Sequence, residues 1–222
     1  MIFNYIKIIL TWSILLLLLS SCEKEQKFTM NLSNFFTIDK NATYVYKILN
    51  TNKVKGQKEP FISEMYMEKQ ITQAKNHCID IQSYQLFDNK DIEQMDKQLR
   101  AELKDNKLRT IDEKYCIDNN TITINGVIHM NLDKKWNLIS KSIPVDESKS
   151  AESKIECQVI DVSKKLILNI ERQTIHTQCI DKENTMNWFF AEKIGLYRME
   201  FISKFPEFHS QSKNEIILVR EK

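Results

Sequence analysis

Short segments in which apolar and polar residues alternate, separated by polar turns, limit most strongly what this chain can fold into. In residues 61–71 the even-numbered set includes Glu64 and Glu68, whereas the odd-numbered set includes two methionines. A period of two residues predicts a strand with one buried face. Runs rich in β-branched and aromatic residues at 42–49 and 78–87 lie on either side, with short polar connections. The three runs together predict an antiparallel meander.

The Asn-Gly pair at 125–126 marks the clearest hairpin of the chain. This pair favours a two-residue type I′ turn, because both positions of that turn need a positive φ. The resulting register pairs Ile124 with Val127 and Ile122 with His129. His129 then lies on an aliphatic face, which favours a core or edge histidine over a catalytic one.

Further runs of the same kind predict strands along the rest of the chain. They cover 136–143, 155–162, 166–171, 174–180, 188–202 and 215–219. A polar stretch at 145–154 predicts an exposed loop. About nine or ten strands without a βαβ rhythm predict a mainly β (or α+β) fold, namely a curved antiparallel sheet, a sandwich or a partial barrel.

Residues 90–104 differ from these runs. Four apolar residues recur at helical spacing among charged ones, and Asp88 or Asn89 is a suitable N-cap. The apolar residues are Ile92, Met95, Leu99 and Leu103. The pattern predicts one amphipathic helix whose apolar stripe covers a face of the sheet.

The first residues have the pattern of a secretory signal. Lys7 is the only charged residue before a run of apolar residues at 8–19. This run is too short to span a bilayer comfortably, which disfavours the alternative of an uncut transmembrane helix. Leu19-Ser20-Ser21-Cys22 resembles a bacterial lipobox, in which an aliphatic residue and two small residues precede an invariant cysteine.

The lipobox resemblance implies that the signal is removed before Cys22 and that its thiol carries a diacylglycerol thioether. Two or three acyl chains hold a protein firmly on a membrane, whereas one binds marginally. Glu23 stands where an Asp would favour retention in the inner membrane. The resemblance therefore implies a lipid-anchored protein of the cell envelope, on the periplasmic face of the outer membrane if the organism is Gram-negative.

Export also bears on the domain organisation and on the cysteines. We expect a signal peptide at 1–21, a polar tether at 22–33 and a single β-rich domain at 34–222. Four cysteines remain after Cys22, and an even number in an exported chain favours two disulfides with three possible pairings. They are Cys78, Cys116, Cys157 and Cys179.

Charge and glycine content exclude several classes of function. Without the signal, 31 basic residues face 30 acidic ones, so charge gives no reason to expect nucleic acid as a partner. Phosphate loops, dinucleotide fingerprints and nucleophile elbows all need glycines. The chain has three glycines, and none has such a context. We therefore expect no nucleotide or other cofactor.

A second resemblance lies in the mature part. Phe35 and Phe36 precede the strand at 42–46, and an aromatic-Ala segment at 190–198 closes on Gly195. The pattern resembles uncharacterised β-rich envelope lipoproteins of bacteria, a family with no established activity. The glycine expected two positions before Gly195 is Lys193 here, so the closing motif is incomplete.

The candidate sites are few. His176 and Cys179, and the pair His77-Cys78, offer metal-ligand types without the paired spacing of zinc sites, so we expect no metal. Glu64 and Glu68 lie on one strand face and are more simply a solvated face. No residue is expected to be catalytic.

Two hypotheses remain for function. The leading one is a membrane-anchored, non-enzymatic lipoprotein that binds or scaffolds an envelope protein or an amphipathic ligand. The alternative is a carrier of lipid or lipoprotein with an apolar cavity. Six side chains could line such a cavity or equally form core: Tyr44, Tyr46, Phe189, Leu196, Met199 and Phe201.

Overall fold

The computed structural model describes residues 30–36, 39–141, 152–205 and 210–221. It confirms a mainly β fold with an antiparallel, strongly curved sheet. Within these ranges, twelve strands follow one another. They are β1 (Thr43–Val54), β2 (Phe61–Lys75), β3 (Cys78–Leu86), β4 (Lys107–Asp118), β5 (Thr121–Ile124), β6 (Val127–Asn131), β7 (Trp136–Lys141), β8 (Glu152–Ile167), β9 (Ile170–Ile180), β10 (Asn184–Ala191), β11 (Gly195–Phe205) and β12 (Ser210–Glu221).

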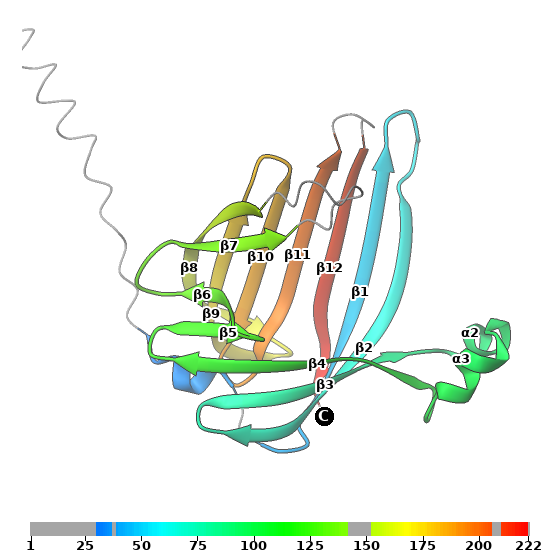
Figure 1. Ribbon diagram of the computed structural model, residues 1–222, viewed down its shortest axis with the longest axis horizontal. Helices are drawn as coiled ribbons and strands as arrows, with labels where there is room; N and C mark the ends of the chain where they lie inside the picture. The colour runs from blue at the N-terminus through cyan, green and yellow to red at the C-terminus, as the bar shows by residue number, and fades with distance from the viewer. Residues whose placement is uncertain (1–29, 37–38, 142–151, 206–209, 222) are drawn as a thin grey trace, which may run out of the picture.

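The sheet is an up-and-down meander that closes on itself through its first and last strands. Neighbours in sequence are neighbours in the sheet, except that β6 and β7 form its two ends while β1 pairs with β12. The curvature brings the two ends close together, so the sheet is barrel-like and nearly closed. Figure 1 shows the tall strands β10, β11, β12, β1 and β2 as a wall, with β4 running across it.

The hairpin at residues 125–126 is confirmed in its turn and corrected in its register. Asn125 and Gly126 both have positive φ, and Ile124 pairs with Val127 as predicted. An irregularity between Ile122 and Thr123 then shifts the ladder, so that Ile122 pairs with Met130 rather than with His129.

Tight turns elsewhere in the sheet use few glycines. Asn76-His77, Asp105-Asn106 and Leu168-Asn169 each place two consecutive residues at positive φ. Asn and Asp tolerate this region better than most side chains, because they hydrogen-bond to the local backbone. The strand predicted at 155–162 is part of β8, which continues to Ile167. The segment predicted as a strand at 166–171 instead contains the turn at Leu168-Asn169 that leads into β9.

The segment predicted as one helix forms two short ones. α2 (Asn89–Gln94) ends at Met95, and α3 (Lys97–Glu102) begins after Asp96, whose extended backbone and side-chain bond to the Leu99 amide make a new N-cap. Neither helix contains a buried residue. They project beyond the sheet rather than covering its face (Figure 1), which corrects the expected role of the apolar stripe.

The N-terminal segment seals one end of the sheet. η1 (Leu32–Phe35) buries Leu32 to 2 % exposure, so the packed part begins before residue 34 and the expected tether is shorter. Phe36 packs so closely on Gly195 that a Cβ there would lie 2.6 Å from its ring. Gly195 also has a φ of 80°, and Lys193 adopts a φ of 64° at the position where the resemblance expects glycine.

The four cysteines form two disulfides between adjacent strands. Cys78 of β3 is bonded to Cys116 of β4, and Cys157 of β8 to Cys179 of β9. The prediction of two disulfides is confirmed, and the structure selects one of the three pairings.

Candidate functional site

One row of side chains crosses the concave face of the wall formed by the tall strands. The register places Met65, Ile48, Ile216, Met199 and Trp188 side by side on β2, β1, β12, β11 and β10. Residues two apart on a strand share a face. Ile48 therefore faces the same side as the buried Tyr46, which puts the whole row on the concave face.

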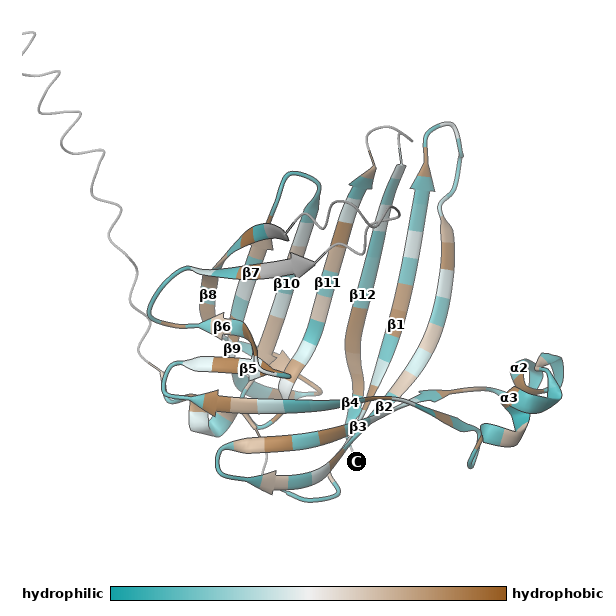
Figure 2. Cartoon of the chain, viewed as in Figure 1, coloured by the Kyte–Doolittle hydropathy of each residue, from teal (hydrophilic) through white to brown (hydrophobic). Residues whose placement is uncertain are grey.

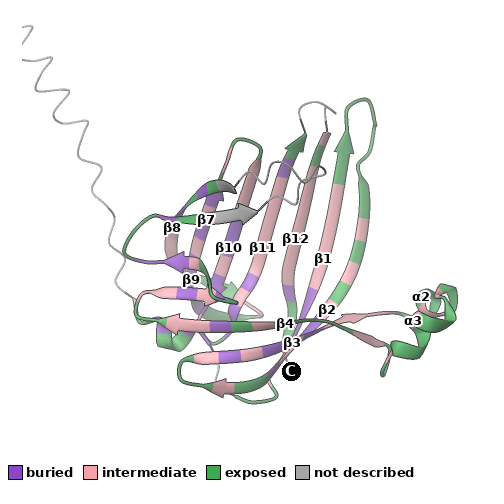
Figure 3. Ribbon diagram, in the orientation of Figure 1, coloured by how far each residue is buried: buried purple, intermediate pink, exposed green. Residues whose placement is uncertain are grey.

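The cover over this row changes abruptly along its length. At one end the His129 ring of β6 lies 4.7 Å from the Trp188 ring, and Trp188 is buried. The four aliphatic side chains of the row on the next strands are only partly buried. Figure 2 shows hydrophobic segments side by side on β11, β12 and β1, and Figure 3 shows intermediate exposure there but buried residues on β10.

The next row toward the strand ends is more polar. Ser63, Asn50 and Asn214 lie beside one another, followed by Phe201 and Met186. Asn50 donates a hydrogen bond to the Ser63 hydroxyl. The concave face thus offers an apolar band with a hydrogen-bonding rim, which suits an amphipathic occupant.

Below the row, the interior is filled. Phe36, Tyr46, Lys69 and Tyr115 border a space of about 10 Å³, about enough for one water molecule at most. Lys69 forms an ion pair with Glu113 and lies 5.8 Å from the Tyr46 ring centre. Burial raises the pKa of the Tyr46 and Tyr115 hydroxyls well above their ordinary value, so both stay protonated.

The convex face of the same strands carries charge instead. Arg198 contacts Glu200 at 2.5 Å and Glu215 at 3.0 Å, and Lys213 contacts Glu215 at 2.9 Å. Burial pushes the pKa of Glu215 upward, but the neighbouring Lys213 and Arg198 outweigh burial and lower it.

The two glutamates of β2 also lie on the convex face. Glu64 pairs with Lys47, and this contact lowers the pKa of the Glu64 carboxyl. Glu68 pairs with Lys107 but is only 6 % exposed, so the expectation of a fully solvated pair is corrected for Glu68.

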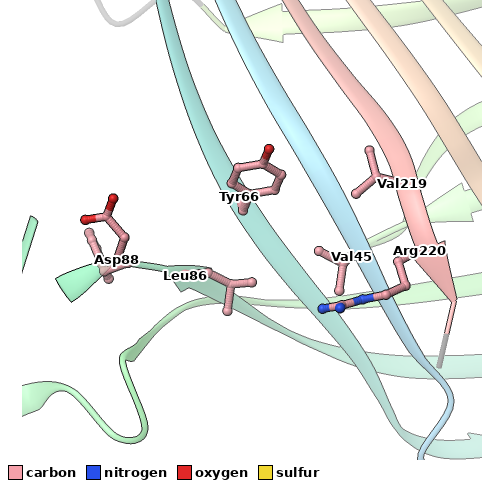
Figure 4. Close-up of a pocket in the computed structure, with 7 residues that line it drawn as sticks. Val45, Tyr66, Leu86, Asp88, Val219 and Arg220 are labelled. Carbon is pink, nitrogen blue, oxygen red and sulfur yellow. The ribbon is translucent and has the colours of Figure 1, made fainter. Parts of the chain in front are cut away.

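A groove lies on the convex face, where β12, β1, β2 and the end of β3 meet. Val45, Tyr66, Leu86, Val219 and Arg220 line a groove of about 520 Å³. Figure 4 shows the Arg220 side chain extending past Val45 toward Leu86, with Asp88 farther along the chain. The Asp88 carboxylate is already engaged as the N-cap of α2.

The residues considered for metal binding serve other purposes. Cys78 and Cys179 are in disulfides, and the His176 ring stacks on Phe189 at 4.3 Å and contacts Asn187. The described residues contain no cluster of three metal-ligating side chains. Cys22, the predicted lipidation site, lies outside the described residues.

The six side chains considered for a cavity separate into three groups. Phe189 lies on the convex face, since its neighbour Trp188 points to the concave one. Tyr44 and Tyr46 are core, and Leu196 packs against the core beside them. Met199 and Phe201 belong to the open part of the concave face. Sequence reasoning missed Ile48 and Ile216, because only the pairing of β1 with β12 brings them together.

Comparison with known proteins gives distant likenesses only. No family model matches the chain, and no curated protein is significantly similar. A solved "putative lipoprotein" of Parabacteroides distasonis has 10 % identity and a TM-score of 0.37 over 87 % of this chain and 100 % of its own. An exported protein of Bacteroides fragilis with a YmcC-like fold has 10 % identity and a TM-score of 0.35 over 85 % of this chain and 98 % of its own. These values do not place the chain in a family.

No helix within the described ranges is long and apolar enough to cross a membrane.

Proposed function

We propose that this chain is a lipid-anchored, non-enzymatic binding protein of the cell envelope, which holds its ligand on the open part of the concave face. The observation that carries the proposal is the apolar row at Met65, Ile48, Ile216 and Met199, which is partly exposed although it continues the buried row at Trp188. An apolar patch bordered by polar residues is typical of an interaction site.

The anchor rests on the lipobox resemblance at 19–22 and on the export that the two disulfides suit. Met30 packs against the hydrophobic core, so the lipid on Cys22 would lie only eight residues before a packed residue. Membrane lipid would be the anchor's partner, and the near-neutral charge of the mature chain gives nucleic acid no attraction.

A non-enzymatic role is supported by the surroundings of two histidines. His129 packs on Trp188 and donates from Nδ1 to the Val127 carbonyl, and burial lowers the pKa of its ring. His176 is held between Phe189 and Asn187. Each ring fills a packing role rather than activating a neighbouring hydroxyl or thiol.

Two measurements test the anchor. Mass spectrometry of the native N-terminal peptide is expected to show an acylated Cys22, and Cys22→Ser is expected to release the protein from the membrane fraction. A protein that stays firmly bound to membranes after Cys22→Ser would contradict the anchor.

A matched pair of variants tests the binding face. Ile48→Asn changes the concave face, whereas Leu49→Asn changes the convex face one residue later, at a similarly half-buried position. Binding of an apolar dye that fluoresces on transfer from water is expected to fall with Ile48→Asn and to persist with Leu49→Asn. Equal binding by both variants would place the binding surface elsewhere.

The carrier hypothesis uses the same face and is kept as the second candidate. Methionine side chains adapt to ligands of different shape, and Met65, Met67 and Met199 share the concave face. A carrier is expected to take up a long-chain fatty acid in a one-to-one complex and release it to vesicles. A scaffold is expected to bind a protein segment without carrying lipid between membranes.

A further inference from the structure

The strands β4, β5 and β6 form a second layer over the concave face of the wall (Figure 1). The concave face is open where this layer ends. β5 pairs with β4 only between Tyr115 and Asp118, although β4 begins at Lys107. Beyond the turn at Asn125-Gly126, no described strand continues beside β4. The part of β4 before Lys114 is therefore an edge within the sheet.

The disulfide fixes which backbone groups this edge presents. Cys78 and Cys116 have a Cα–Cα distance of 4.1 Å, typical of a pair that exchanges no backbone hydrogen bonds. Because the two kinds of pair alternate, Lys114 also points its N–H and C=O away from β3. Both groups indeed bond to Asn125, the amide through the Asn125 side chain and the carbonyl through its backbone N–H.

Asp112 continues this alternation two residues earlier. It pairs with Gln82 without a shift in register, so its backbone N–H and C=O also point away from β3. No partner for either group occurs among the described residues. The neighbouring Ile111 points into the concave side, as Glu113 does, and is 53 % exposed.

The open edge and the apolar row lie next to each other. Tyr115 of β4 lines the same small space as Tyr46 of β1 and Leu196 of β11, so β4 packs against the wall one row below Ile48. Neighbouring strands in a sheet are about 4.8 Å apart. A strand added beside β4 would thus lie over the row that contains Ile48 and Ile216, continuing the line of β5.

We propose that the edge of β4 at residues 108–113 binds an extended polypeptide segment by strand addition, and that alternate apolar side chains of this segment cover the open apolar row. The proposal deepens the proposed function by naming its ligand class. An added strand would form main-chain hydrogen bonds with the N–H and C=O of Asp112, which is how strand addition binds to the edge of a sheet. The row at Met65, Ile48, Ile216 and Met199 calls for apolar side chains at every second position.

The alternation also predicts which peptide groups matter. Asp112 faces the convex side, so peptide residues that bond to it direct their own side chains outward. The inward apolar residues direct their N–H groups away from β4. A peptide of alternating valine and threonine should therefore bind with threonine N–H groups on β4 and valine side chains on the row.

The probe is a fluorescent octapeptide of alternating valine and threonine with lysines at both ends, titrated onto the full chain in vesicles and followed by anisotropy. N-methylation of the threonines is expected to abolish binding, whereas N-methylation of the valines is expected to preserve most of it. Hydrogen exchange at 108–113 is expected to slow when the unmodified peptide binds.

Variants of the protein complete the test. Asp112→Pro removes the edge N–H at a position where proline is tolerated, and is expected to weaken binding by about tenfold. Asp112→Asn keeps the N–H and is expected to bind like the wild type. Unchanged peptide binding by Asp112→Pro, equal binding of both methylated peptides, or no binding in the millimolar range would overturn the proposal.

A lipid outcome is also distinguishable. If a fatty acid binds the wild type and Asp112→Pro equally, is lost in Ile48→Asn and excludes the peptide, the face is a lipid site and strand addition is wrong. Failure of the anchor would appear only in the membrane fractionation of Cys22→Ser and would leave peptide binding unchanged.

Discussion

Trp188 and Met199 are direct partners on neighbouring strands and share the concave face, yet one is buried and the other is partly exposed. The difference lies in what crosses over them. β6 reaches Trp188 through the His129 ring, which lies 4.7 Å from the Trp188 ring, whereas Met199 stays partly exposed. Trp188 and Met199 are both apolar, so what packs over each residue, rather than its residue type, divides this face into core and surface. Substitutions in the covered part and in the open part of this face therefore test whether the two parts differ in packing.

The largest expected difference is between two phenylalanines of the concave face. Phe190 is fully buried in the covered part, whereas Phe201 is partly exposed in the open part. Phe190→Ala is expected to cost about 4 kcal/mol of unfolding free energy, because it leaves a cavity. Phe201→Ala is expected to cost about 1 kcal/mol or less. Urea denaturation measures both, and similar losses would show that the open part is packed as tightly as the core.

The two disulfides extend the comparison to covalent links. Cys157 and Cys179 are fully buried, whereas Cys78 and Cys116 are partly exposed. Loss of either link is expected to cost roughly 3 kcal/mol through the unfolded chain, and the buried pair somewhat more because alanines leave a void there. Double Cys→Ala variants in urea denaturation measure this difference.

Exposure also predicts the order in which the two disulfides are reduced in the folded protein. A mild phosphine reductant is expected to open Cys78–Cys116 first, because these two residues are partly exposed and the other pair is buried. Alkylation followed by peptide mass spectrometry identifies the reduced pair. Simultaneous reduction of both would indicate that reduction requires global unfolding.

The fold class could be predicted from the sequence, because the alternation of apolar and polar residues is a local pattern. The two disulfides could be predicted from the even number of cysteines in a chain with an export signal. β4 was missed, since most of its residues from Lys107 to Lys114 are charged or polar. Its polarity reflects its place at an open edge, beside the buried Lys69, which needs Glu113 as a partner. The turn at Leu168-Asn169 was missed because it lacks the glycine that usually marks such turns.

The candidate site was beyond sequence reasoning for a different reason. Ile48 and Ile216 are direct partners from opposite ends of the chain. Periodicity assigns each residue to a face of its own strand, but it does not reveal which distant strand lies alongside. The cover over Trp188 depends on where β6 lies, which follows from the pairing of β5 with β4 and β6 and not from the period of either strand.

The ion pair inside the filled part gives a smaller expected effect. Lys69→Met leaves the partly buried Glu113 carboxylate without its cation, and the expected cost is about 2 kcal/mol, below that of a fully enclosed pair. Adding Glu113→Gln removes the stranded charge and is expected to restore part of the loss. A double variant no more stable than Lys69→Met would mean that packing, rather than charge, sets the cost.

The smallest expected effect is a pH dependence at the boundary between the covered and open parts. The His129 ring belongs to β6, and its burial against Trp188 lowers its pKa below 6.5, the ordinary value. The unfolded chain therefore binds a proton at a higher pH than the folded chain does. The free energy of unfolding is expected to be highest above the pKa that His129 has in the unfolded chain. It is expected to fall as the pH drops through this pKa, until the ring of the folded protein also protonates.

His129→Gln removes this titration while keeping a side chain that can donate to the Val127 carbonyl. The pH dependence of the urea midpoint between about pH 8 and pH 5 is therefore expected to be shallower in His129→Gln than in the wild type. His176→Gln is the matched control, because that ring stacks on the convex face, away from the cover over Trp188. If His176→Gln flattens the profile as much as His129→Gln does, the pH dependence does not arise from the burial of His129 against Trp188.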